Sequence, residues 1–225
     1  MGDCEQCMVR KLSALKVLKG EEIKSISSCK VTKRIKKGEV IFKEGEMLNG
    51  VYCISSGVCK LTKLTEKGKE QVVKLVVKGE LLGQRSVILN QVANLSATAL
   101  NDMEYCYIPK QEIVKDLLEN NEFSFQVLRT MAEDLKEAET AIINMAQKSV
   151  RNRLAEIILY LNDNFGVDDA NYLKVTLSRD DFASIVGTAT ESVIRTLSQF
   201  KKEDLIKTSG KRIQIKDYDA LQMME

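Results

Sequence analysis

The sequence predicts an α+β protein with an N-terminal β-roll of the jelly-roll type, a long central helix and a C-terminal winged helix-turn-helix. Three observations support this fold class. Short alternating segments broken by glycine run from Val31 to about Tyr107, a seven-residue apolar repeat follows the single proline, Pro109, and the last third reads as helix, turn, helix and hairpin. The predicted domains are residues 1–121, 122–147 and 148–225.

Composition narrows the function classes. The 225 residues are 44% hydrophobic, which is enough to build a core, and neither a signal peptide nor a membrane-length apolar run stands out. We therefore expect a cytoplasmic protein without a membrane partner. The chain has no histidine, so the commonest general base and metal ligand is missing, and we predict that it is not an enzyme. Lys and Arg number 34 against 32 for Asp and Glu, so nucleic-acid binding would need segregated charge.

The glycine spacing carries the prediction for the first domain. Glycines recur at strand-and-turn intervals, which favours a closed all-β architecture. These positions are Gly38, Gly45, Gly50, Gly57, Gly68, Gly79 and Gly83.

The central helix is predicted from a heptad repeat. Its apolar positions are Leu128, Leu135 and Ile142 in one series and Met131, Ala138 and Met145 in the other. A stripe of this kind favours pairing with a second copy of the same helix, and hence a homodimer. The alternative is that the stripe packs on the β domain. A second helix, at 149–165, ends at Gly166, and 172–177 reads as a strand.

The stretch LSRDDFASIVGTATESVIRTL predicts two helices around a tight turn. Ser178 with Asp181 indicates a capping box at the first helix, Gly187 supplies the turn, and Thr188 can cap the second helix. Phe182, Ile185 and Val186 would face inward from the first helix, and Val193, Leu197 and Phe200 from the second. The following LIKTSGKRIQI predicts a hairpin that turns at Ser209-Gly210.

Charge is segregated in this last part. The basic residues between 195 and 216 are Arg195, Lys201, Lys202, Lys207, Lys211, Arg212 and Lys216, against the acidic Glu203 and Asp204. One face could therefore hold phosphates of double-stranded DNA. Ser178 and Arg179 at the start of the first helix, Thr188 and the wing lysines are candidate phosphate contacts.

Glu191 and Arg195 lie four residues apart on the second helix. One interpretation is structural: Thr188 and Glu191 form a capping box, and Glu191 pairs with Arg195 at the surface. The other is base reading, in which the carboxylate accepts from cytosine N4 and the guanidinium binds guanine O6 and N7. The flanking helix-turn-helix pattern favours base reading.

These residues resemble the CRP/FNR family of bacterial transcription regulators over nearly the whole chain. The resemblance implies that Glu191 and Arg195 contact a G·C-containing half-site. It also implies phosphate contacts at Ser178, Arg179 and Ser192 and a wing contact near Lys211. Thr190 departs from the residues of the two best-known branches, so the outer bases that it would read stay open.

In the cAMP-binding branch of this family, a glutamate after a glycine holds the ribose and an arginine before a serine neutralises the phosphate. Here the matching positions are Gly83, Gln84, Leu95 and Ser96. Both charged ligands are missing, so cAMP is not the expected effector. Arg85 nearby could serve another anion or lie in solvent, and the effector pocket is otherwise unknown.

The oxygen-sensing branch binds a [4Fe-4S] cluster through cysteines. The resemblance places Cys4, Cys7 and Cys106 at three ligand positions and Ser13 at the other, with Cys29 as a substitute. The alternative is that Cys106 is an inward-facing strand residue like Cys53 and Cys59, and that Cys4 and Cys7 lie in a mobile tail. An iron-sulfur cluster or thiol redox switch and a purely structural role both stay open.

The sequence thus predicts a homodimeric, sequence-specific DNA-binding transcription regulator, acting on a near-palindromic site with RNA polymerase as a partner. Its signal is unidentified. Two rival classes are a ligand-binding module whose winged helix contacts protein, and a cupin-like metalloenzyme, which the absence of histidine disfavours.

Overall fold

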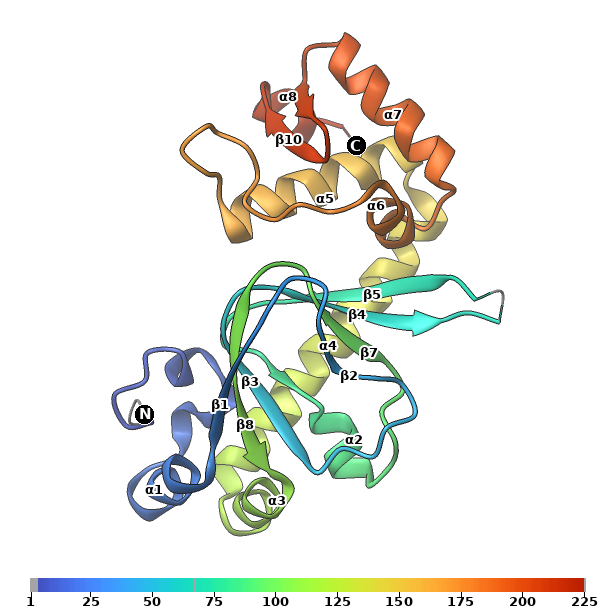
Figure 1. The fold of residues 1–225 in the computed structure, drawn as a ribbon. Helices are drawn as coiled ribbons and strands as arrows, with labels where there is room; N and C mark the ends of the chain where they lie inside the picture. Colours follow the sequence, from blue (N-terminus) through green and yellow to red (C-terminus); the bar gives the residue numbers. More distant parts are fainter. Residues whose placement is uncertain (1–3, 67, 225) are drawn as a thin grey trace. The chain divides into compact units, whose positions relative to one another are not determined.

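The computed structural model describes residues 4–66 and 68–224 and divides the chain into two compact units, 1–136 and 137–225. Figure 1 shows the order of the elements along the chain. One helix, α4 (Asn121–Gln147), runs through the point where the units divide. The three predicted domain boundaries remain a prediction.

The first unit contains two antiparallel four-stranded sheets, in the orders β1-β8-β3-β6 and β2-β7-β4-β5. The strands of the first sheet are β1 (Val31–Ile35), β8 (Met103–Pro109), β3 (Gly50–Ser56) and β6 (Leu81–Leu82). Those of the second are β2 (Val40–Phe42), β7 (Ser96–Ala99), β4 (Cys59–Leu64) and β5 (Glu70–Val76). The predicted β-roll is confirmed.

The two faces of the first sheet line different cores, because side chains alternate along a strand. Tyr52 and Ile54 of β3 belong to the core that the second sheet completes. Val51 and Cys53 belong to a second core on the other face. That outer face is covered by the N-terminal segment, α1 (Gly20–Cys29), α3 (Lys110–Glu119) and the start of α4, as seen in Figure 1.

The N-terminal segment is folded around one arginine, contrary to the mobile tail considered from the sequence. Arg10 donates hydrogen bonds to the main-chain oxygens of Cys4 and Leu18, at 3.0 and 2.9 Å, and to two others between them. Leu18 is fully buried. Two short 3-10 helices, η1 (Arg10–Leu12) and η2 (Ala14–Val17), lie in this segment. One side chain thus closes the loop by donating to four main-chain oxygens of this segment.

Helix α4 buries only its first turns. Phe123 and Val127 are in the outer core, and Met131 packs against it. By contrast, Leu128, Leu135 and Ile142 of the heptad stripe are 63%, 62% and 68% exposed. Most of the stripe therefore does not pack on the β domain, which contradicts that alternative. An apolar stripe of this kind is available to another helix.

The second unit is a small helical domain with a hairpin. Its elements are α5 (Val150–Phe165), α6 (Arg179–Val186), α7 (Thr190–Lys202), β9 (Ile206–Ser209), β10 (Arg212–Ile215) and α8 (Tyr218–Gln222). Helices α6 and α7 both pack on α5, and α7 also contacts β9. The segment 172–177, predicted as a strand, does not form one, because its pairing is limited to an isolated bridge between Leu173 and Val167 and a hydrogen bond from the Leu173 amide to the Ile213 oxygen.

Within the described residues, none of the helices is both long and apolar enough to cross a membrane.

Candidate nucleic-acid interface and sensor region

The start of α6 is fixed by the predicted capping box. The Ser178 hydroxyl accepts from the Asp181 amide at 3.0 Å, and the Asp181 carboxylate accepts from the Ser178 amide at 3.0 Å. Gly187 then adopts the left-handed conformation with φ of 69°, which favours glycine. Phe182 and Val186 are buried as predicted, whereas Ile185 is only partly buried. The helix-turn part of the prediction is thus confirmed.

The start of α7 differs from the prediction. Ala189, not Thr188, is the N-cap, and its side chain makes no capping hydrogen bond. The amide of Thr188 donates to the oxygen of Ala183 at 3.0 Å, so Thr188 still belongs to the closing turn of α6. The capping box proposed for Thr188 and Glu191 is therefore wrong.

Glu191 and Arg195 are both exposed on the first turns of α7. The structure assigns neither side chain a hydrogen bond or ion pair with any residue in the ranges 4–66 and 68–224. The surface ion pair of the structural interpretation is therefore not formed. Val193, Leu197 and Phe200 of the same helix are buried at 3% exposure or less, as predicted, which holds the opposite face toward solvent.

Two further polar residues lie at the start of α7. The hydroxyl of Thr190 donates to the Asp180 carboxylate at 2.7 Å, so this candidate base reader joins α6 to α7. Ser192 is partly buried, and its amide bonds to Ala189. Thr190 would have to release Asp180 before its hydroxyl could donate to a base.

The hairpin forms the predicted wing with a shifted turn. Ser209 pairs with Arg212, so the turn residues are Gly210 and Lys211, not Ser209 and Gly210. Lys211 is exposed at the tip. Arg179 of α6 donates from Nη2 to the Gly210 oxygen at 3.1 Å, and its half-buried guanidinium has a pKa lowered by burial. Its Nη1 is buried and makes no hydrogen bond within the described residues.

The basic residues between 195 and 216 are all exposed, but Arg212 is engaged within the domain. Its guanidinium stacks 4.2 Å from the centre of the Tyr172 ring and pairs with Asp168. The acidic Glu203 is paired with Arg151, which lowers the pKa of Glu203. The local excess of positive charge therefore rests on Arg195 and the lysines.

The predicted effector positions lie around α2 (Gln84–Leu89). Gly83 precedes this helix with φ of 82°, Arg85 is exposed, and the Ser96 hydroxyl accepts from the Glu44 amide at 2.9 Å. None of Gly83, Gln84, Leu95 and Ser96 supplies a cation for a cyclic phosphate, and Arg85 points to solvent instead of into the core. These residues do not fit a cyclic nucleotide held in the usual way.

The core between the two sheets is instead filled by aromatic rings. The Tyr52 ring centroid lies 5.4 Å from that of Phe42 and 5.5 Å from those of Tyr105 and Tyr107. A Cβ added at Gly83 would lie 3.6 Å from the Tyr52 ring. Burial raises the pKa of Tyr52 to about 12, with smaller contributions from its tyrosine neighbours. The sequence analysis did not find this cluster, although alternate tyrosines on one strand could have indicated it.

The cysteines do not assemble a cluster site. Ser13, at the third ligand position, uses its hydroxyl to donate to the Arg10 oxygen and to accept from the Leu15 amide, at 2.8 and 3.2 Å. In the described residues no group of three or more cysteine and acidic side chains is placed to hold a metal ion. Cys29 bonds to the Ile26 oxygen of its own helix. The residues present therefore do not fit a four-cysteine iron-sulfur cluster, and the set of Cys4, Cys7, Cys106 and Cys29 is not supported.

What the cysteines surround is a lysine. Lys30 is 7% exposed, and it makes a side-chain hydrogen bond with Cys4. Burial lowers its pKa, but Cys4, Cys106 and Cys7 together raise it by more. Cys53 and Cys106 face this outer core, not the roll interior, whereas Cys59 does face the interior. No sequence pattern indicates this arrangement, because it depends on contacts between distant segments.

A second lysine missed by the sequence analysis links the β-roll to α4. Lys74 of β5 binds Asp134 of α4 at 2.6 Å and Glu80 at 2.9 Å. Burial disfavours its charge, but the two carboxylates raise the pKa of Lys74 overall. The ion triad fixes the β4-β5 hairpin to the helix that carries the heptad stripe.

Comparisons with known proteins agree with this arrangement. Residues 32–121 match the cyclic nucleotide-binding domain family, and residues 152–224 match the Crp-like helix-turn-helix domain family. The chain is 29% identical over 222 residues to the anaerobic regulatory protein of Haemophilus influenzae, covering 97% of this chain and 86% of that protein. It is 26% identical over 219 residues to the transcriptional activator protein Anr of Pseudomonas protegens, covering 95% and 88%.

A solved structure with a similar fold is FixK2 from Bradyrhizobium japonicum. It superposes with a TM-score of 0.76 at 22% identity, covering 87% of this chain and 97% of that chain. A β-roll and a Crp-like helix-turn-helix therefore occur in one chain, in the same order as in relatives that it matches along nearly its whole length. This chain belongs to the CRP/FNR family of transcription regulators.

Proposed function

We propose that this protein is a cytoplasmic, sequence-specific DNA-binding transcription regulator that acts as a homodimer on a near-palindromic site. The observation that carries the proposal is the pair Glu191 and Arg195, which are exposed on the first turns of α7 and make no hydrogen bond or ion pair with the residues that the structure describes. An arginine fork matches guanine O6 and N7, and a carboxylate accepts from cytosine N4. Residues that stabilise only their own helix would not need to stay unpaired.

Phosphate contacts would orient this helix. Lys211 presents a donor at the exposed wing tip, and the partly buried Arg179 is bonded to the same turn through Gly210. Ser178, Thr188 and Ser192 are further candidates at the two helix starts. Contacts of this type set the register of the protein on the duplex and make affinity fall with salt.

The exposed stripe of α4 supports the homodimer. Leu128, Leu135 and Ile142 would otherwise leave an extended apolar surface in water. Two recognition helices related by a two-fold axis read half-sites about one helical turn apart. The protein would act without catalysis of its own, by contacting RNA polymerase, and its signal is unidentified.

Selection from a pool of duplexes with a randomised central region tests this proposal. We expect a near-palindromic consensus whose half-sites contain a G·C pair, and an affinity for it that falls steeply with salt. The double variant Glu191→Ala, Arg195→Ala is expected to bind without consensus. The matched control is Gln199→Ala and Ser198→Ala on the exposed later turns of α7, which should select the wild-type site. Weak binding with neither consensus nor salt dependence would instead favour a winged helix that contacts protein.

A further inference from the structure

Two cysteines lie directly opposite each other on neighbouring strands. In the antiparallel pairing of β3 with β8, the register partner of Cys53 is Cys106. Directly opposed residues in an antiparallel pair have Cα atoms about 4.5 or 5.5 Å apart. Both distances fall within the range of about 4.4–6.8 Å that a disulfide spans. The strand register therefore places these two thiols within bonding reach without movement of the backbone.

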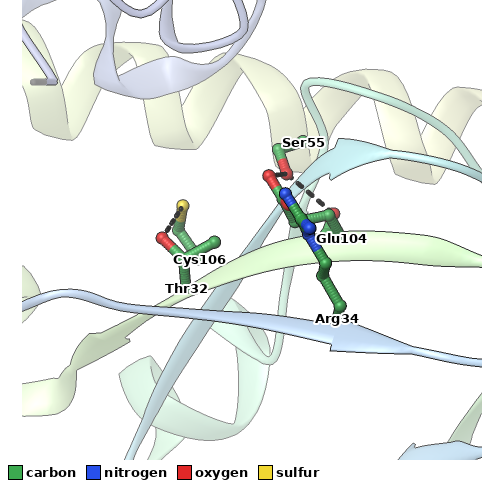
Figure 2. A network of polar contacts seen from close by, with 5 residues as sticks. All are labelled: Thr32, Arg34, Ser55, Glu104 and Cys106. Carbon is green, nitrogen blue, oxygen red and sulfur yellow. Dashed lines mark hydrogen bonds and ion pairs between the residues drawn. The ribbon is translucent and has the colours of Figure 1, made fainter. Parts of the chain in front are cut away.

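Both side chains face the same layer, the outer core beneath the N-terminal segment. Cys53 is 7% exposed, and Cys106 is partly exposed. On the other side of Cys106, across β1, Thr32 approaches its sulfur at 3.5 Å, as Figure 2 shows. Since β1 is an edge strand of its sheet and Thr32 is exposed, a small molecule can reach Cys106 from this side. Cys53 itself is buried.

The two thiols differ in protonation and access. Burial raises the pKa of Cys53 to about 12, and its cysteine neighbours add to this, so Cys53 stays a thiol. Cys106 is the more exposed of the two sulfurs, so it is the one that a peroxide meets first.

We propose that Cys53 and Cys106 form a reversible disulfide in response to hydroperoxides, with Cys106 as the attacking thiol and Cys53 as the resolving thiol. The sulfur of Cys106 attacks the peroxide, an S–O bond forms, the O–O bond breaks and an alcohol or water leaves. The sulfur of Cys53 then displaces the hydroxyl of the sulfenic acid, which leaves as water with the thiol proton. Two thiols and one hydroperoxide thus yield one disulfide, one alcohol or water, and one water.

This modification site goes beyond the proposed DNA-binding function and does not depend on it. It also differs from a metal site, because it needs only the pair that the sheet register brings together. Cys59 provides an internal contrast. It is fully buried in the other core, and its register partners are Val76 and Ala99, not a cysteine.

The test is peptide mapping of the reduced, full-length protein after treatment with one equivalent of hydrogen peroxide and alkylation of the remaining thiols. Trypsin leaves Cys53 in the peptide 44–60 and Cys106 in the peptide 86–110. We expect these two peptides to be joined, and to separate after reduction by a dithiol. Because 44–60 also contains Cys59, the link must persist in Cys59→Ser and disappear in Cys53→Ser.

A link from Cys106 to Cys4 or Cys7, or no link at one equivalent of peroxide, would overturn the proposal.

Discussion

Arg179 at the start of α6 donates a hydrogen bond of 3.1 Å to the main-chain oxygen of Gly210 in the turn of the wing. Helix α6 and the wing are therefore joined by a residue that is also a candidate phosphate contact. Its Nη1 is buried and makes no hydrogen bond within the part of the chain that the structure describes. Removing this side chain should have two separable effects.

Arg179→Ala is expected to lower the free energy of unfolding by about 1–3 kcal/mol, since the buried guanidinium loses its bond and leaves a space. DNA affinity should fall as well, and urea unfolding together with fluorescence anisotropy measures both. Lys211→Ala is the matched control on the same turn. It should leave stability unchanged and reduce the slope of log affinity against log salt by about 1. Equal stability of Arg179→Ala and wild type would show that the bond to Gly210 does not hold the wing.

Arg195→Ala should change sequence preference without changing stability. The side chain is exposed and makes no hydrogen bond or ion pair with the described residues, so its removal is expected to alter the free energy of unfolding by less than about 0.5 kcal/mol. Discrimination at one G·C position should fall by about 1–3 kcal/mol. Competition binding with single-base variants of the selected site measures this. If preference were retained while the melting temperature fell, Arg195 would be a structural residue.

Asp116 should make the first unit less stable as pH rises. Burial raises its pKa to about 6, with Glu22, Glu112 and Glu119 adding to this and Lys115 opposing it. Because this value exceeds the ordinary 3.8, the protonated form is favoured by folding. The contribution is fully present below about pH 4, and it is lost as pH rises through about 6. We expect Asp116→Asn to raise the free energy of unfolding at pH 7.5 by about 1–3 kcal/mol.

The control for Asp116 is a carboxylate with the opposite shift. Asp102 is held ionised by the side chain of Lys36 and the amide of Lys37, which lower its pKa. Asp102→Asn should therefore destabilise the protein, and only at pH values above the ordinary pKa of an aspartate. Chemical unfolding at pH 5.0 and 7.5 measures the free energy of unfolding of both variants, which should rise for Asp116→Asn and fall for Asp102→Asn. An Asp116→Asn variant whose stability followed the wild-type pH profile would contradict the assignment.

Leu135→Glu is expected to separate the dimer into monomers. Leu135 is 62% exposed in the single chain, and covering such a side chain contributes about 1.5–3 kcal/mol per copy. The substitution also places like charges opposite each other across the two-fold axis. Sedimentation equilibrium measures the change, and Glu133→Ala, on another face of α4, should leave the association state unchanged. A monomeric wild-type protein would count against the heptad prediction.

Local rules succeeded where one segment determines its own structure. The capping box of Ser178 and Asp181 was predictable because both partners lie within one helical turn. The glycine at 187 was equally clear, since the turn requires a left-handed residue. The predicted N-cap of α7 at Thr188 was wrong by one position, because the Thr188 amide donates to Ala183 at the end of α6. The sequence does not show whether a residue between two helices belongs to the end of the first or the start of the second.

Features that depend on long-range register could not be predicted. Cys53 and Cys106 were recognised as strand residues, but the face on which they lie follows from the pairing of β3 with β8 and from what covers it. Burial of Lys30 depends on the same layer. Exposure of Glu191 and Arg195 was predictable from the spacing of Val193 and Leu197. The hydrogen bond from the Thr190 hydroxyl to the Asp180 carboxylate was not.

The last turns of α4 have a consequence for how this protein can be divided. A Cβ added at Gly187 would lie 3.5 Å from Met145 Cε, so Met145, placed in the heptad stripe by sequence, packs beside the turn of the helix-turn-helix. Arg153 of α5 donates to the main-chain oxygen of Met145 at 2.6 Å. A fragment that began at the predicted domain boundary of residue 148 would lack Met145 and therefore both of these contacts. An isolated DNA-binding domain should therefore start several residues earlier, inside α4, so that it includes Met145 beside Gly187.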